Sequence, residues 1–183
     1  MAVACIDTIR LHARRKGKLP IIGVYGTPYH VNGESGEDWE NVLASRAEFQ
    51  KIGSHEWPEV NGYVFDIKHK IGSSSIPHGR STSIEKDMLW NLIWAVNEMQ
   101  PRARMLLRGH VHYHQFTGNV RKTGMTLPPL QAMGTKYGGR QCSGLVDWGM
   151  TTFDVSSDGA ACDWRTHTVT IKTQVAHTTK VGE

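Results

Sequence analysis

Two histidines separated by one residue make Gly109-His110-Val111-His112 the segment of this chain with the clearest chemical potential. The segment follows a mostly apolar stretch, Arg104 to Leu107, that is typical of a buried strand. Neutral imidazole is the commonest metal ligand in proteins, and a ligand pair at the end of a strand is held precisely because the sheet fixes its backbone. Glycine allows a tight turn at this point. The segment therefore predicts a metal site in which two imidazoles face one cation.

Two further histidines follow predicted strands. His30 comes after the apolar stretch Leu19 to Tyr25, and His69 comes after Gly62 to Ile67. In an open α/β sheet, ligands bind outside the carboxyl ends of the strands, so histidines that follow parallel strands meet at one edge. A single histidine is more often an ordinary surface or core residue than a metal ligand. Its recurrence at three strand ends favours the metal site.

The segments that connect these strands have helical patterns. Apolar residues recur at helical spacing in residues 2–16, in residues 38–49, and from the capping-box sequence Thr82-Ser83-Ile84-Glu85 up to Pro101. Downstream of residue 107, glycine-rich turns separate four predicted strands, at residues 111–120, 126–133, 146–155 and 164–175. The predicted fold class is α/β, with a mixed sheet flanked by helices.

Composition limits the class of protein further. The chain has 183 residues, 39% hydrophobic, which suits a single domain with a substantial core. Its three cysteines are far apart and form no C-x-x-C pair, so neither disulfides nor a thiolate zinc site are indicated, and the cytoplasm is the expected compartment. No apolar run reaches the length of about 18 residues needed to span a membrane. The formal net charge of +4 favours a phosphate-bearing partner.

The histidine motifs resemble a known family. His69 and Gly109-His110-Val111-His112 match the last two signature motifs of the calcineurin-like metallophosphoesterase superfamily. The preceding family motif, G-N-H followed by an acid, is replaced here by Gly26-Thr27-Pro28-Tyr29-His30, which is most similar to a phage-type branch. The resemblance implies an αββα sandwich and the hydrolysis of a phosphate mono- or diester by two divalent transition metal ions, namely manganese, zinc or iron.

The resemblance also implies roles for individual residues. His69 and His110 would bind the second metal ion of the pair, and His112 would bind the first. His30 would be catalytic, either as a general acid or as a positive charge near the leaving-group oxygen. Thr27 stands near the position of the family's asparagine ligand, but two residues separate it from His30, so no metal bond is assigned to it.

The chain departs from the family at its start. The first two family motifs, D-x-H and G-D-x-x-D, should precede the predicted helix before Gly26, and neither is present in residues 1–16. We therefore expect residues 1–183 to form a single, incomplete metallophosphoesterase-like domain that corresponds to the C-terminal portion of the fold. Three explanations remain open: a truncated or split gene product, a partner chain or second copy that completes the sheet and the site, or a protein that has lost hydrolysis and still binds.

Two loops could contact a partner. Arg80 and His78 lie in a Ser/Gly/Pro-rich loop, where the guanidinium could bind a substrate phosphate or could be an ordinary solvated arginine. The segment Lys136 to Arg140 combines basic, aromatic and glycine residues, which suits contact with nucleic acid as well as a flexible hairpin. The leading hypothesis is a metal-dependent phosphoesterase. The alternative is a noncatalytic, phage-encoded module that binds nucleic acid or takes part in assembly.

Overall fold

The computed structural model describes residues 2–13, 19–27, 38–74, 76–130, 147–169 and 179. Their helices and strands follow one another as α1 (Ala2–His12), β1 (Ile22–Val24), α3 (Trp39–Arg46), β2 (Lys51–Gly53), β3 (Glu59–Val60), β4 (Tyr63–Lys68), η1 (Pro77–Gly79), α4 (Thr82–Val96), β5 (Met105–Arg108), β6 (Gln115–Asn119), β7 (Lys122–Thr126), β8 (Trp148–Val155) and β9 (Cys162–Val169). The predicted α/β class is confirmed. None of the described helices is long and apolar enough to cross a membrane.

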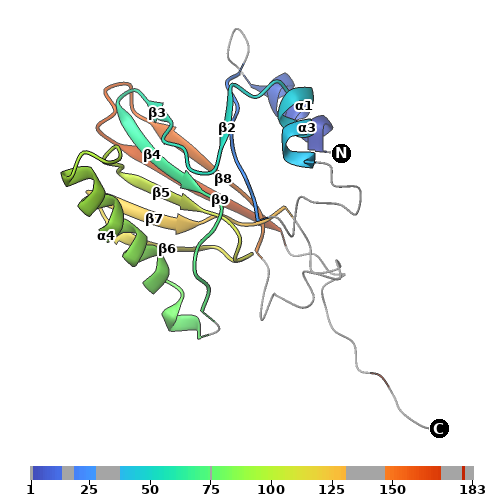
Figure 1. Cartoon of the computed structure of the whole chain (residues 1–183). Helices are drawn as coiled ribbons and strands as arrows, with labels where there is room; N and C mark the ends of the chain where they lie inside the picture. The colour runs from blue at the N-terminus through green and yellow to red at the C-terminus, as the bar shows by residue number, and fades with distance from the viewer. Residues whose placement is uncertain are drawn as a thin grey trace.

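The largest sheet has the strand order β3-β4-β5-β7-β6. Its three inner strands, β4, β5 and β7, are parallel, and the outer strands β3 and β6 pair with them in antiparallel fashion. The predicted crossover through α4 therefore connects two adjacent parallel strands, β4 and β5. Strands β1 and β2, which α3 connects, are also parallel but form a separate two-stranded sheet (Figure 1).

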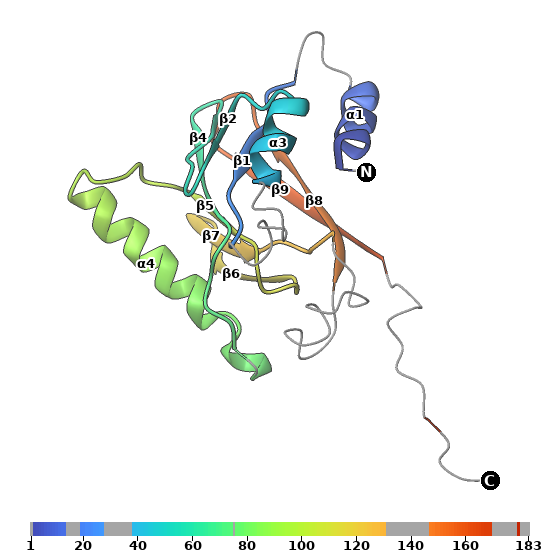
Figure 2. The same cartoon turned by 45° about the vertical axis from the view of Figure 1, so that its right-hand side comes forward.

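The hydrophobic core lies on one face of the five-stranded sheet. Alternation along the strands places a buried cluster on this face, made of Tyr63, Phe65, Met105, Leu107 and Met125. The antiparallel hairpin β8-β9 covers the cluster as a second layer (Figure 2). The layers meet through aromatic contacts such as that of Phe65 with Phe153, whose rings are edge to face with centroids 5.5 Å apart.

The turn of the β8-β9 hairpin docks on the turn between β3 and β4. Gly159 lies at the contact with a φ of 66°, and a side chain there would collide with the backbone of Asn61. The Asn61 side chain donates a hydrogen bond to the carbonyl of Ser156 at 3.1 Å. Arg104 donates to the carbonyls of Gly159 and Ala160 at 2.8 and 2.7 Å. These contacts fix the second layer against the first.

Helix α4 covers the opposite face of the five-stranded sheet (Figures 1 and 2). Ile84 is fully buried against the sheet, where the absence of a side chain at Gly124 lets the helix approach. The predicted capping box is wrong, because Ser81 is the N-cap residue and its side chain makes no capping hydrogen bond. Glu85 instead accepts a hydrogen bond from the hydroxyl of Thr117 at 2.9 Å, so its side chain fastens the helix to β6.

The strands after residue 108 differ from the prediction in their bounds. The expected strand at residues 111–120 is reduced to β6, because His110 and His112 have positive φ angles that interrupt an extended backbone. The strand predicted for residues 126–133 is represented among the described residues by β7, which ends at Thr126, and residues 131–133 lie outside the described residues. The side-chain oxygen of Asn119 accepts hydrogen bonds from the backbone N–H groups of Arg121 and Lys122, and this turn signal was missed. Strands β2 and β3 were not predicted.

Candidate metal centre

His69 and His110 meet at the carboxyl ends of two adjacent parallel strands. The pairing of Lys68 with Arg108 ends the β4-β5 ladder, and each histidine lies one or two residues beyond it. The Nε2 atom of His69 and the Nδ1 atom of His110 are 3.3 Å apart. The ring planes are inclined by 70°, with centroids 5.2 Å apart. The structure therefore brings together two of the three predicted metal-binding histidines, and their role as ligands stays a prediction.

The backbone of the Gly-His-Val-His segment is unusual. His110 and His112 have φ angles of 73° and 57°, in the left-handed region that costs a residue with a side chain about 1 kcal/mol or more. The N–H of Val111 donates to the carbonyl of Gly109 at 2.9 Å, which closes a tight turn centred on His110. A Cβ atom on Gly109 would lie 3.3 Å from the His69 ring, so glycine lets the two strand ends approach closely. Such backbone strain is concentrated at functional sites.

The spacing of the two imidazole nitrogens fits a metal ion. In tetrahedral coordination with metal–nitrogen bonds of about 2.0 to 2.1 Å, two ligand nitrogens lie about 3.3 to 3.4 Å apart. The separation of 3.3 Å between His69 and His110 has this value. Among the described residues, no group of three or more His, Cys, Asp or Glu side chains could hold an ion. The pair therefore fits as two ligands of one ion, and the described part of the chain holds no complete two-metal centre.

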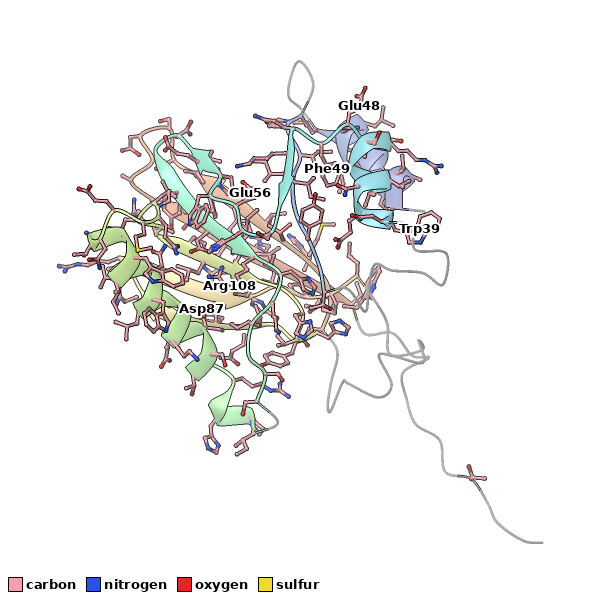
Figure 3. All side chains as sticks on the ribbon, viewed as in Figure 1. Trp39, Glu48, Phe49, Glu56, Asp87 and Arg108 are labelled. Carbon is pink, nitrogen blue, oxygen red and sulfur yellow. The ribbon has the colours of Figure 1, made fainter. Side chains whose placement is uncertain are left out.

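A buried polar network lies next to the histidine pair, between the sheet and α4. Asp66 and Arg108 are only 1% and 3% exposed, and the guanidinium donates to the carboxylate at 2.7 Å. Arg108 also donates to Asp87 of α4 at 2.7 Å, and Figure 3 shows these two side chains side by side. His55 and Asn91 contact the Asp66 carboxylate at 2.8 and 3.2 Å. The network joins β4, β5 and α4 immediately before the strand ends that carry the histidines.

The network keeps Asp66 ionised despite its burial. Burial alone would raise the pKa of Asp66, but the hydrogen bond with His55 and the charge of Arg108 outweigh it, so the pKa lies below its ordinary value. Nearby, Lys122 donates to the side-chain oxygen of Asn91 at 2.8 Å. Burial lowers the pKa of Lys122, partly opposed by the charge of Asp66. Asn91 therefore links Asp66 of β4 to Lys122 of β7 within this network.

The Asp66 pKa predicts how stability changes in acid. Because the pKa in the folded state lies below the ordinary value of 3.8, the carboxylate contributes stability that is complete above this value and is lost as pH falls through the folded-state pKa. The Asp66→Asn variant lacks this titration. It should be less stable at neutral pH but should lose less stability than the wild type as pH falls below about 4. Urea unfolding at a series of pH values measures the free energy of unfolding of the wild type and of the variant. An equal loss of stability in acid for the two proteins would contradict the prediction.

Sequence reasoning missed this network. The signal was present, because Asp66 and Arg108 are charged residues within or at the end of otherwise apolar strands. A charge at a position that faces the interior of a sheet needs a partner of opposite sign. What the sequence did not show is that the two residues would lie on the same face of adjacent strands.

Arg80, predicted to bind a substrate phosphate, lies against the residue that follows the Gly-His-Val-His segment. Its guanidinium carbon is 4.3 Å from the ring centre of Tyr113, in a cation–π contact. The Nε atom of Arg80 and the hydroxyl of Tyr113 are buried without a hydrogen-bond partner among the described residues, as is the hydroxyl of Thr27. His78, the second predicted substrate contact, is exposed in the 3-10 turn η1.

The other histidines are distributed as follows. His30, the predicted catalytic residue, lies outside the described residues, as does the basic segment Lys136 to Arg140. His112 is half-buried at the left-handed turn. His114 is a structural residue, because its Nδ1 contacts the carbonyl of Thr126 at 2.9 Å and its Nε2 contacts the hydroxyl of Thr166 at 3.2 Å.

Comparisons with known proteins add similarities of structure. The sequence matches no protein-family model, and no curated protein is significantly similar to it. A single mutant of Vps29 from Entamoeba histolytica aligns over 90% of this chain and 88% of its own length, with 10% identity and a TM-score of 0.46. Wild-type Vps29 from the same organism, complexed with zinc, aligns over 89% and 88%, with 11% identity and a TM-score of 0.45.

An archaeal phosphodiesterase is also similar, over 88% of this chain and 74% of its own length, with 13% identity and a TM-score of 0.43. All three similarities combine identities of 10 to 13% with TM-scores below 0.5. They therefore assign no ligand, partner or activity to this chain.

Proposed function

We propose that this chain is a metal-dependent phosphoesterase domain in which His69 and His110 are two ligands of a divalent transition metal ion. The observation that carries the proposal is the separation of 3.3 Å between their ring nitrogens, at the ends of two adjacent parallel strands. This is the separation of about 3.3 Å that two nitrogens have around a tetrahedral ion such as zinc. The left-handed backbone at His110, which the surrounding structure must hold in place, supports a functional origin for the arrangement.

The metal ion and the residues of the chain would each supply part of the chemistry. A divalent ion, when bound, would neutralise charge on a phosphate ester and lower the pKa of a water molecule beside it. Arg80 would bind a phosphate oxygen, because its guanidinium lies over the ring of Tyr113, next to the segment that carries His110 and His112. The formal net charge of +4 would attract such an anionic substrate.

The sequence motifs support the finer parts of the proposal. They resemble those of the calcineurin-like metallophosphoesterases, and of a phage-type branch among them, which implies action on a phosphate mono- or diester with manganese, zinc or iron. In this proposal His112 binds a first ion of a two-metal centre, His78 assists Arg80 with the substrate, and His30 assists the leaving group. A partner chain would supply the bridging carboxylate that the two-metal centre requires.

The second candidate function is a noncatalytic module that keeps the fold and binds nucleic acid or another protein. One observation favours it: the described residues contain no group of three or more metal-ligating side chains. A histidine pair that is only a remnant of a metal site would still be held at the strand ends by the buried network of Asp66 and Arg108. Metal affinity and hydrolysis distinguish the two candidates.

The first test is metal binding by the purified full chain. Titration calorimetry with zinc, manganese or cobalt should show binding to the wild type. His110→Ala should lower the metal affinity by about 100-fold or more, because removing a residue that only hydrogen-bonds to a metal ligand already lowers the affinity by about 10- to 100-fold. The His12→Ala variant is the matched control, since His12 is exposed on α1 and its ring is hydrogen-bonded to the carbonyl of Thr8 on the same helix. Its affinity should equal that of the wild type.

The second test is hydrolysis of bis(p-nitrophenyl) phosphate in the presence of each metal ion. Turnover that His110→Ala abolishes and His12→Ala preserves would support the phosphoesterase. Metal binding without turnover would favour the noncatalytic module. A wild-type chain that neither binds zinc, manganese or cobalt nor cleaves the ester would refute the phosphoesterase proposal for this chain.

A further inference from the structure

Helix α4 has apolar residues on two opposite faces. Its inner face carries Ile84 and the polar Asn91, which are 0% and 2% exposed. Its outer face carries Leu89, Ile93 and Val96, which are 57%, 38% and 76% exposed. Spacings of four and three residues place these three side chains in one line along a helix. The outer face of α4 therefore differs from that of an ordinary surface helix, whose solvent-facing side is polar.

The apolar outer face is long and free of charge. We name it the outer stripe, and its exposed members are Leu89, Leu92, Ile93 and Val96. No charged residue occurs between Asp87 and Glu98 in the sequence. Figure 2 shows α4 as an outermost layer, with the sheet on its inner side. An exposed apolar surface of this kind marks an interaction site.

The charges at the two ends of the outer stripe have opposite signs. Lys86 stands before it and Glu98 stands after it, and both are exposed and form no ion pair within the described part of the chain. The neighbouring acids are engaged elsewhere, because Glu85 bonds to Thr117 and Asp87 bonds to Arg108. Helix α4 ends at Val96, and Glu98 lies two residues beyond its end. The ten residues from Lys86 to Val96 correspond to about 15 Å along the helix, and Leu92 is near the middle of the outer stripe.

We propose that the outer stripe is the interface of a homodimer in which two copies of α4 pack antiparallel about a two-fold axis near Leu92. Such an axis makes the interface self-complementary and places Lys86 beside Glu98 of the partner subunit. The same symmetry repeats this charge pair, so the interface contains two of them. A parallel arrangement would instead bring two lysines together at one end and two glutamates at the other. The charge pattern therefore selects a second copy of this chain as the occupant. The inference does not depend on the proposed function.

The first test is the mass of the full chain in solution, measured by sedimentation velocity over a range of concentrations. The wild type should sediment as a species of twice the 20.5 kDa chain mass. Ile93→Glu should weaken dimerisation by about 100-fold or more, because each copy then places a carboxylate within an apolar interface. Val120→Glu is the matched control: Val120 is 96% exposed but lies in the β6-β7 turn, and this variant should remain dimeric.

The second test exchanges the end charges, which Ile93→Glu leaves in place. Lys86→Glu alone and Glu98→Lys alone should each weaken the dimer by about tenfold, because each change replaces two attractions by two repulsions. The double variant should recover the wild-type affinity. Circular dichroism confirms that each variant is folded. A monomeric wild type, a dimer that Ile93→Glu leaves intact, or a double variant no tighter than the single ones would overturn the proposal.

Discussion

Replacing Arg108 with methionine is expected to lower the free energy of unfolding by about 3 to 5 kcal/mol, because removal of one member of a buried ion pair leaves the other charge without compensation. Asp66 is 1% exposed and would keep only its contacts with His55 and Asn91. Methionine resembles the stem of arginine in length, so packing changes little. Urea unfolding followed by circular dichroism measures the loss.

The control is Arg121→Met, since Arg121 is exposed in the turn between β6 and β7 and its replacement should change stability by less than about 0.5 kcal/mol. A second comparison combines Arg108→Met with Asp66→Leu. The double variant should regain part of the lost stability, because a buried ion pair can be replaced by apolar side chains at little cost. Equal losses in Arg108→Met and Arg121→Met would show that the buried pair contributes nothing.

Replacing Gly159 with alanine is expected to lower the free energy of unfolding by about 2 to 4 kcal/mol. The φ of 66° at Gly159 costs alanine about 1 kcal/mol. The new Cβ would also collide with the carbonyl group of Asn61, and overpacking of this kind costs about 1 to 3 kcal/mol. Backbone atoms cannot rotate away as a side chain can, so the hairpin β8-β9 must shift from its position over the core.

Gly62→Ala separates these two contributions. Gly62 has a φ of 82°, but no atom lies within 4 Å of a Cβ built there. Alanine at position 62 should therefore cost only about 1 kcal/mol, the conformational part of the Gly159 effect. Urea unfolding of the two variants measures the difference, which is the contribution of the docked turn. If the two variants lose the same stability, the turn does not hold the second layer in place.

Local sequence patterns predicted the elements that carry the histidines. The apolar stretches around β4 and β5 are continuous because these strands are buried on both faces, and such stretches are visible without knowledge of the fold. The helical periodicity between them indicated a crossover, and a crossover implies parallel strands. The two buried strands and the crossover helix between them together imply that His69 and His110 lie close together. That is why this part of the site was predictable.

Contacts that depend on the order and register of the strands were not predictable. Asp66 and Arg108 are paired because β4 and β5 are neighbours and each residue faces α4. Strand β7 lies between β5 and β6, which nothing in the local sequence indicates. The buried Asn91 on the inner face of α4 likewise has distant partners, because it contacts Asp66 of β4 and Lys122 of β7. Long-range partners of this kind decide which polar residues a helix buries.

The alternation of side chains along β4 makes the core and the histidine pair subject to the same alignment error. Tyr63 and Phe65 face the hydrophobic cluster, and Asp66 faces α4. If β4 slid by one residue against β5, each side chain would move to the opposite face, so Phe65 would leave the core and the Asp66 carboxylate would enter it. A molecule with misaligned histidines would thus also lack a stable core. A stable core and correctly aligned histidines therefore depend on the same register between β4 and β5.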